Sequence, residues 1–350
     1  MNNHLKTSLE AGPCVASAPC RVDLGGTLDI KTLYLPMACF SPSTFNMAID
    51  LRTTVTLRPY QPGRIKISSR GFEDVEFALR EASFDHPLGL MTAIAAHFDA
   101  DGVHINIDSK SPPRSALGGS SAAAVALTAA LAKACGIADA FPKARLVMTA
   151  HGIEEGVARI PCGLQDQLAA AFGGVNTWYW KNPDAGDICF EQRPVLDGDR
   201  LSAFESCFLV AYCGMPHESK NINGKWVDHF IRAQDRGLWR EIIDCSNGFT
   251  EALAEGDLER AAGWMNQEVA ARRRMTPDVL DETGNRLVDC AAETRCGGRF
   301  TGAGGGGCVW AIGVPEHITM LREKWQAILK TRQGACLLAA GIDRRGIVVE

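Results

Sequence analysis

The sequence predicts an α+β fold built of two domains, and three observations favour this prediction. The chain has 350 residues, about the length of two domains. Segments with strand and helix patterns come in runs, not in regular strand–helix–strand alternation. A polar run over residues 182–187 follows Trp178-Tyr179-Trp180 and indicates a domain edge near residue 185. We therefore expect a first domain over residues 1–185 and a second over residues 186–350.

The composition is that of an ordinary globular protein. Apolar residues make up 46% of the chain and charged residues 22%, which excludes wholesale disorder. The net charge is -5, from 36 basic and 41 acidic residues, and this balance argues against nucleic acid or an anionic membrane as a partner. The best apolar run, 122–132, is too short to span a membrane, and residues 1–14 lack the apolar core of a secretory leader. We expect a cytoplasmic protein.

The cysteines favour the same compartment. Their number, 13, is odd, they are scattered, and neither a C-x-x-C motif nor a zinc-like Cys/His spacing occurs. We expect reduced and mostly buried thiols, with Cys39 and Cys296 partly exposed.

The elements of the first half begin after residues 1–13, which we expect to form a frayed tail. Apolar and polar residues alternate over 52–58, 64–68 and 103–108, which predicts strands of a largely antiparallel sheet with one wet face. Ser111-Pro112-Pro113 then breaks the chain. Helices are predicted at about 122–135, 144–160 and 163–172, and the last ends at Gly173-Gly174.

The second half opens with a predicted strand at 207–212. Four helical segments follow, at about 225–234, 238–255, 258–274 and 277–294. A glycine-rich turn at 302–307 leads into an apolar strand at 308–312. A helix over about 316–331 and a strand at 346–349 complete the pattern, and no internal repeat is present.

Three glycine-bearing segments are the candidates for chemistry, and the first is 18–30. A short strand carries Arg21, Gly25-Gly26 turns the chain, and Asp29 follows. The glycines would let a small ligand approach the backbone, Asp29 would accept hydrogen bonds from hydroxyls, and Arg21 would supply a fixed charge. A tight turn capped by an aspartate, with Arg21 at the surface, is the more common arrangement for such a segment taken alone.

The second segment, 112–123, is a glycine-rich loop that opens a helix. Such a helix start binds anions, because its backbone N–H groups converge and the helix dipole adds positive charge. Ser120 or Ser121 stands where an N-cap belongs, and both could offer hydroxyls to phosphate or Mg²⁺. A Walker loop is excluded, since no Gly-Lys-[Ser/Thr] is present. A plain capped helix is the alternative, and Gly118-Gly119 favours phosphate.

The third segment, 297–308, holds a literal G-x-G-x-x-G from Gly302 to Gly307. A dinucleotide site would need a strand before it and a helix after it, but here the strand-like residues follow. We expect a backbone loop against phosphates or substrate. A flexible hairpin turn is the alternative, although so many glycines would cost much backbone entropy for a turn alone.

Acidic residues lie between these loops. Asp166, in Gln165-Asp166-Gln167, stands near a helix start and is either a helix-stabilising residue or a catalytic carboxylate. Glu154 and Glu155 could supply a metal ligand or form a solvent face.

Taken together and in this order, the three segments resemble the motifs of the GHMP kinase superfamily. RVDLGGTLD resembles its first motif, LGGSSAA its phosphate loop and GGRFTGAGGGGC its third motif. The block GLQDQLAAAFGGVN at 163–176 resembles the sugar-kinase branch, in particular heptose and fucose kinases. The resemblance covers about residues 16–313.

The resemblance implies a ribosomal-S5-like N-terminal domain, a ferredoxin-like C-terminal domain and an active site between them. It also implies ATP, Mg²⁺ and phosphoryl transfer to a hydroxyl of a small molecule. In it, Asp166 matches the catalytic aspartate and Arg21 the arginine beside it. Ser121 and Glu155 would ligate Mg²⁺, and Glu155 is preferred to Glu154 because it lies eleven residues before Asp166, as in mevalonate kinases.

The remaining residues fall into two groups by the ligand they would contact. The ATP phosphates would lie against the loop and helix start that contain Pro112, Leu117, Gly118, Gly119, Ser120, Ser121 and Ala122. The substrate would lie against Asp29, Gly25, Gly26, Gly302, Ala303, Gly304 and Gly305.

The substrate is less sharply defined. Between Arg21 and Asp29 the first motif is one residue shorter than in galactokinases and lacks their Glu-His, which argues against galactose. We expect a sugar or sugar phosphate as substrate, phosphorylated at the anomeric hydroxyl of a hexose or a heptose, heptose 7-phosphate included. A non-sugar alcohol such as mevalonate or phosphomevalonate is the alternative, and a catalytically silent sensor of sugar or nucleotide is a third. Whether the chain forms a homodimer is left open.

Overall fold

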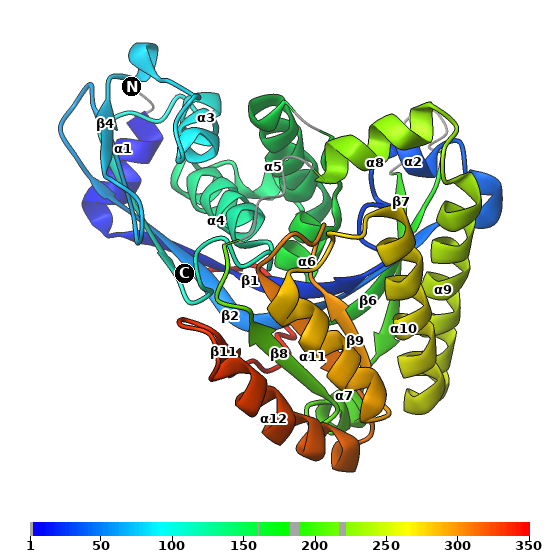
Figure 1. Ribbon diagram of the computed structural model, residues 1–350. Helices are drawn as coiled ribbons and strands as arrows, with labels where there is room; N and C mark the ends of the chain where they lie inside the picture. The colour runs from blue at the N-terminus through cyan, green and yellow to red at the C-terminus, as the bar shows by residue number, and fades with distance from the viewer. Residues whose placement is uncertain (1–2, 160, 183–188, 217–221) are drawn as a thin grey trace.

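The computed structural model describes residues 3–159, 161–182, 189–216 and 222–350. Within these residues the chain forms two sheets, each with its own helices (Figure 1). We call the larger sheet with its helices the first domain and the smaller sheet with its helices the second domain. The predicted two-domain α+β architecture is confirmed.

The first sheet has eight described strands, which run β12-β1-β2-β5-β3-β4, with β6 on β2 and β7 on β6. Only β3 and β5 pair in parallel, so the predicted antiparallel character is confirmed. Its strands are β1 Cys14–Leu24, β2 Ser43–Pro59, β3 Ile65–Ser69, β4 Val75–Phe77, β5 Val103–Ser109, β6 Val175–Trp180, β7 Phe190–Leu196 and β12 Val348–Val349.

The domain edge predicted near residue 185 lies within 183–188, outside the described residues. β7 follows that point but still pairs with β6, and β12 pairs with β1. The first sheet therefore draws strands from both predicted halves of the chain.

Helices α4 and α6 pack on β1 and β2, and α3 and α5 lie against α4 (Figure 1). Almost every residue of α4 is buried, because its alanines let it pack closely on the sheet. The helices of this domain are α1 Asn3–Ala11, α2 Lys31–Tyr34, α3 Gly89–His97, α4 Gly119–Ala134, α5 Lys143–Ala158 and α6 Gln165–Phe172.

The expectation of a frayed tail over residues 1–13 is wrong. Residues 3–11 form α1, whose Leu5 and Leu9 are buried in the core of the first domain. Two leucines four residues apart lie on one face of a helix, so their burial stabilises the helix although the sequence around them is polar.

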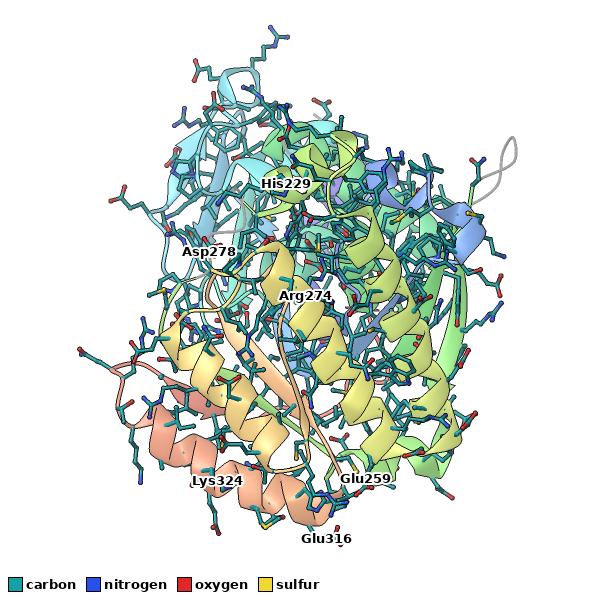
Figure 2. All side chains as sticks on the ribbon, turned by 45° about the vertical axis from the view of Figure 1, so that its right-hand side comes forward. His229, Glu259, Arg274, Asp278, Glu316 and Lys324 are labelled. Carbon is teal, nitrogen blue, oxygen red and sulfur yellow. The ribbon has the colours of Figure 1, made fainter. Side chains whose placement is uncertain are left out.

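The second domain has a four-stranded antiparallel sheet in the order β11-β8-β10-β9. The outer faces of its helices carry charges, such as Glu259 and Arg274 on α10 and Lys324 on α12 (Figure 2). Its elements are α7 Gly198–Phe204, β8 Phe208–Tyr212, α8 Ile222–Ile231, α9 Arg236–Glu255, α10 Leu258–Met275, α11 Glu282–Glu293, β9 Gly297–Phe300, β10 Cys308–Ile312, α12 Pro315–Leu329 and β11 Cys336–Leu338.

Two boundaries in this domain differ from those predicted. The helix expected at 277–294 begins only at Glu282, because the side chain of Asp281 caps it by accepting the N–H of Gly284. The third glycine-rich segment begins as strand β9, so the loop itself covers only residues 301–307.

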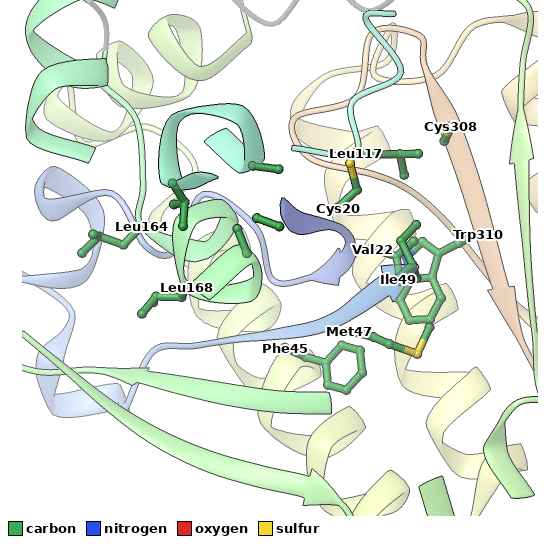
Figure 3. Close-up of a cluster of buried hydrophobic side chains, with 14 of the residues drawn as sticks. Cys20, Val22, Phe45, Met47, Ile49, Leu117, Leu164, Leu168, Cys308 and Trp310 are labelled. Carbon is green, nitrogen blue, oxygen red and sulfur yellow. The ribbon is translucent and has the colours of Figure 1, made fainter. Parts of the chain in front are cut away.

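The two domains share a buried contact (Figure 3). Trp310 of β10 stacks on Phe45 of β2, with ring centroids 6.0 Å apart, and its indole N–H donates to the carbonyl of Asp23 on β1. The thiols are free and mostly buried, as expected. Cys39 and Cys336 are exposed, whereas Cys296 is buried, contrary to expectation. In the part of the chain that the structure describes, no helix is long and apolar enough to cross a membrane.

Candidate active site

A cavity of about 460 Å³ lies where the start of α4, the start of α6 and the strand β1 meet the loop after β9. Arg21, Asp29, Ser121 and Asp166 line it from the first domain, and Gly302 and Ala303 from the second. The structure therefore brings the three glycine-bearing segments and Asp166 to one place.

Arg21 and Asp166 form an ion pair in the cavity wall. The Nε of Arg21 donates to Oδ1 of Asp166 at 2.7 Å, and its Nη1 donates to the carbonyl of Ala116 at 2.5 Å. Burial favours the neutral form of Arg21, but the carboxylates of Asp166 and Asp23 outweigh it and raise the arginine pKa above its ordinary value. Arg21 is therefore a fixed charge and not the surface residue of the alternative interpretation.

The start of α4 forms a second part of the wall. Gly118 precedes the helix with φ +74°, and Gly119, Ser120 and Ser121 follow in the first turn. All four residues line the cavity, and the N–H groups of a helix start and the helix dipole favour an anion there. The N-cap is Gly118 and not Ser120 or Ser121, which leaves both hydroxyls available to other partners.

Those hydroxyls bind Glu154, the neighbour of Glu155, which the resemblance favours as the metal ligand. Ser121 Oγ donates to Glu154 at 2.8 Å and Ser120 Oγ at 3.2 Å, and the Gln167 amide donates at 2.7 Å. Glu155 is exposed and does not line the cavity. Successive residues of a helix point about 100° apart, so only one of two adjacent glutamates can face the serines.

Burial raises the pKa of Glu154 to about 7; the hydrogen bond from Ser121 opposes this rise and the charge of Asp166 adds to it. Among the described residues, no group of three or more His, Cys, Asp or Glu side chains gathers to hold a metal ion. One carboxylate and one hydroxyl are nevertheless the protein ligands typical of Mg²⁺ bound with a phosphate substrate, and Glu154 with Ser121 fits that pattern.

Asp29 lies in the same cavity, and no described cationic side chain forms an ion pair with it. Its Oδ2 accepts the backbone N–H of Gln165 at 3.0 Å, and it is 3% exposed. Burial raises its pKa to about 7; the hydrogen bond from Gln165 opposes the rise, and the charges of Asp166 and Asp23 add to it. A Cβ on Gly163 would lie 1.8 Å from this carboxylate, so only glycine allows the approach.

Several predicted contact residues do not line the cavity. Gly25 packs against Ser43 and Ser246, and the carbonyl of Gly26 accepts a hydrogen bond from Arg272. Four others are also not among the lining residues: Leu117, Ala122 and Gly304, which are buried, and Gly305, which is half-buried. The predicted residues that do line it are Arg21, Asp29, Pro112, Gly118, Gly119, Ser120, Ser121, Asp166, Gly302 and Ala303.

Sequence reasoning missed three amide side chains of the wall. Gln165, Gln167 and Asn223 line the cavity, and each has a buried side-chain oxygen without a hydrogen-bond partner in the described structure. The Gln-Asp-Gln triplet was the available signal, but only its aspartate was singled out. The apolar end of the cavity, with Phe72, Leu88 and Met91, had no signal, because tertiary folding alone brings it there.

Comparisons with known proteins agree with this architecture. Residues 85–174 match the family of GHMP kinases N terminal domain. A mevalonate kinase from Thermococcus sibiricus is 25% identical over 364 residues, which cover 96% of this chain and 98% of that protein. A galactokinase from Thermococcus kodakarensis is 24% identical over 308 residues, which cover 77% and 83%.

A solved structure is also similar. A D-glycero-D-manno-heptose 1-phosphate kinase from Bacteriodes thetaiotaomicron superimposes with a TM-score of 0.73 at 17% identity, over 96% of this chain and 98% of that one. At this identity the likeness shows a shared fold.

Proposed function

The chain has a GHMP kinase N-terminal domain within the two-domain fold of GHMP kinases, and from this premise we propose that it is an ATP-dependent kinase acting on a hydroxyl group of a small molecule. One observation carries the proposal. The Arg21–Asp166 pair, 2.7 Å between Nε and Oδ1, lies in one cavity with the anion-attracting start of α4.

Phosphoryl transfer needs positioning and charge neutralisation more than covalent help from the protein. We assign Asp166 to hold the attacking hydroxyl and accept its proton, and Arg21 to stabilise the charge that moves during transfer. In a loose transition state the proton leaves late, so a well-placed carboxylate suffices to accept it.

The nucleotide phosphates would lie against Gly118, Gly119 and the first turn of α4. Ser121 and Glu154 would hold Mg²⁺, which would shield the charge of the phosphates. The base would find apolar surface at the end of the cavity that contains Phe72, Leu88 and Met91.

We infer a sugar as the substrate, because the cavity that contains Asp166 also holds side-chain oxygens that can accept hydrogen bonds from the hydroxyl groups of a sugar. Asp29 and the unpartnered oxygens of Gln165 and Asn223 belong to this set. Mevalonate carries a carboxylate that would need a cation. Among the described residues that line the cavity the cations are Arg21, which is bound to Asp166, and the exposed residues Arg70 and Arg114.

A mevalonate kinase is the second candidate, because the Thermococcus sibiricus enzyme is similar over 96% of this chain. The sugar-kinase block at 163–176 and Asp29 favour the sugar.

The test is a coupled ADP-release assay with Mg²⁺-ATP and a panel of acceptors. The panel contains free and phosphorylated hexoses and heptoses, mevalonate and phosphomevalonate. A sugar that raises turnover well above the rate without acceptor supports the proposal, and turnover with mevalonate alone replaces it by the second candidate. A flat panel with ATP binding intact, seen as a thermal shift, would favour a silent sensor.

Asp166→Asn is the first variant for that assay. It should lower kcat by about 100-fold or more, while KM for ATP changes little, since the carboxylate acts on the acceptor in the transition state. If kcat stayed within a few-fold of wild type, the role of Asp166 as proton acceptor would be wrong. Thermal unfolding of the variant serves as the control for folding.

A further inference from the structure

Six buried or partly buried charges of alternating sign run from the cavity into the second domain. We call this set the charge chain; its members are Asp166, Arg21, Asp23, Arg299, Glu268 and Arg272. The consecutive closest approaches are 2.7, 3.4, 3.0, 3.0 and 2.9 Å. Three positive and three negative groups balance, which a low-dielectric interior requires.

Asp23 is the point where the charge chain joins the two domains. On β1 it lies two residues from Arg21, so both side chains point to the same face of the strand. Its Oδ1 lies 3.4 Å from Nη1 of Arg21 and accepts the N–H of Gly302 at 2.7 Å. Its Oδ2 accepts Nη1 of Arg299 at 3.0 Å. Asp23 thus contacts a residue of the ion pair and a cavity-lining residue of the other domain.

Arg299 in turn fixes Asp23. Its Nη1 also donates to the backbone carbonyls of Asp23, at 3.1 Å, and of Phe300, at 2.7 Å. Its Nε and Nη2 donate to the two oxygens of Glu268, at 3.0 and 3.2 Å. Both Asp23 and Arg299 are 0% exposed, so neither can be solvated and the charge of each depends on its partners in the charge chain.

We propose that Asp23 and Arg299 are positioning residues, which hold the guanidinium of Arg21 and the backbone of Gly302 in register across the two domains. The effect on kcat that this inference predicts rests on the proposed kinase function. An arginine has several rotatable bonds, and a displacement of about 1 Å at a reacting group can cost about 100-fold in rate. Neither residue lines the cavity, so each acts through Arg21 and Gly302.

The test variant is Asp23→Asn and its matched control is Asp343→Asn. Asp343 is also a buried aspartate that binds a buried arginine, Arg52, and accepts backbone N–H groups, but neither Asp343 nor Arg52 lines the cavity. Both variants should lower the melting temperature. Only Asp23→Asn should lower kcat, by about 10- to 100-fold, with KM for ATP within about threefold of wild type. Equal kcat in the two variants would show that Asp23 is merely structural.

A second measurement does not depend on turnover. The Nε–H of Arg21, assigned by its loss in Arg21→Lys, gives a nitrogen-15 NMR signal that should exchange slowly with water in the wild type. Asp23→Asn should speed that exchange, and Asp343→Asn should not. If Asp23→Asn leaves the exchange of the Arg21 Nε–H unchanged, the inference is wrong, whether or not the ADP-release assay finds an acceptor. If the exchange is faster but no acceptor of the panel is phosphorylated, only the kinase proposal is wrong.

If Asp23→Asn does not fold, the double variant Asp23→Asn/Arg299→Gln replaces it. It removes both charges and leaves neither unpaired in the interior. The same kinetic and NMR results are expected. Wild-type kcat and wild-type exchange of the Arg21 signal in this variant would overturn the inference.

Discussion

Asp166 and Asp29 share a cavity, but their surroundings differ. Asp166 is held by an arginine, whereas Asp29 accepts the backbone N–H of Gln165 and forms no ion pair with a cation of the described residues. A buried carboxylate with few hydrogen-bond donors around it resists ionisation. The two acids therefore suit different tasks. Asp166 can act on the reacting hydroxyl, and Asp29 can bind a hydrogen-bond donor of the ligand.

Asp29 should make the protein less stable as the pH rises. Its pKa is about 7 in the fold and near 3.8 when unfolded, so between these values the folded state binds more protons and stability falls with increasing pH. The wild type should lose about 2–3 kcal/mol more unfolding free energy than Asp29→Asn between pH 5 and pH 8. Denaturant titrations at both pH values measure this. Parallel losses in the two proteins would refute the assignment.

At the scale of the element, the start of α4 depends on Gly118. This residue has φ +74°, and a Cβ there would lie 3.2 Å from the carboxylate of Asp166. The absence of a side chain at Gly118 therefore allows both the left-handed turn into the helix and the position of Asp166 in the ion pair.

Gly118→Ala should lower both stability and turnover. The control is Gly63→Ala, at φ +81°, because there a Cβ would meet nothing within 4 Å. Both variants should lose about 1–2 kcal/mol of unfolding free energy through backbone strain. Only Gly118→Ala should lose about tenfold in kcat, since it displaces Asp166. Equal kcat in both would mean that the carboxylate moves without consequence.

Elements with a clear period could be predicted from the sequence, and elements that depend on tertiary pairing could not. The alternation of apolar and polar residues predicted β5, and the alanine-rich composition predicted α4. The pairing of Arg21 with Asp166 was predicted from the resemblance of the motifs. β12 forms within the strand predicted at 346–349, whereas β11, which was not predicted, has three residues and exists through its pairing with β8. The choice between Glu154 and Glu155 needed the rotation of α5 about its axis, which its weak apolar pattern does not fix.

At the scale of the whole molecule, residues 341–350 return from the second domain to the first. The N–H of Asp343 donates to the carbonyl of Ala48, and that of Ile347 to the carbonyl of Ala171, near the end of α6. Asp343 also binds Arg52. This terminal segment therefore fastens the sheet and the C-terminal end of α6, the end opposite Asp166.

Removal of residues 341–350 should loosen the first domain selectively. β1 and β2 lose their contacts with the segment, whereas β8 and β10 have no described hydrogen bond to it. Hydrogen exchange should show lower amide protection in β1 and β2 and unchanged protection in β8 and β10. An equal loss in all four strands would mean that both domains unfold as one cooperative unit.

The return of the chain to β1 also bears on the order of events during synthesis. β1 is made long before β12, because every other strand of both sheets lies between them in the chain. The edge of β1 that β12 covers therefore stays open in the nascent protein until residues 348–349 have left the ribosome. A chaperone that shields this edge during that interval would protect the chain from aggregation.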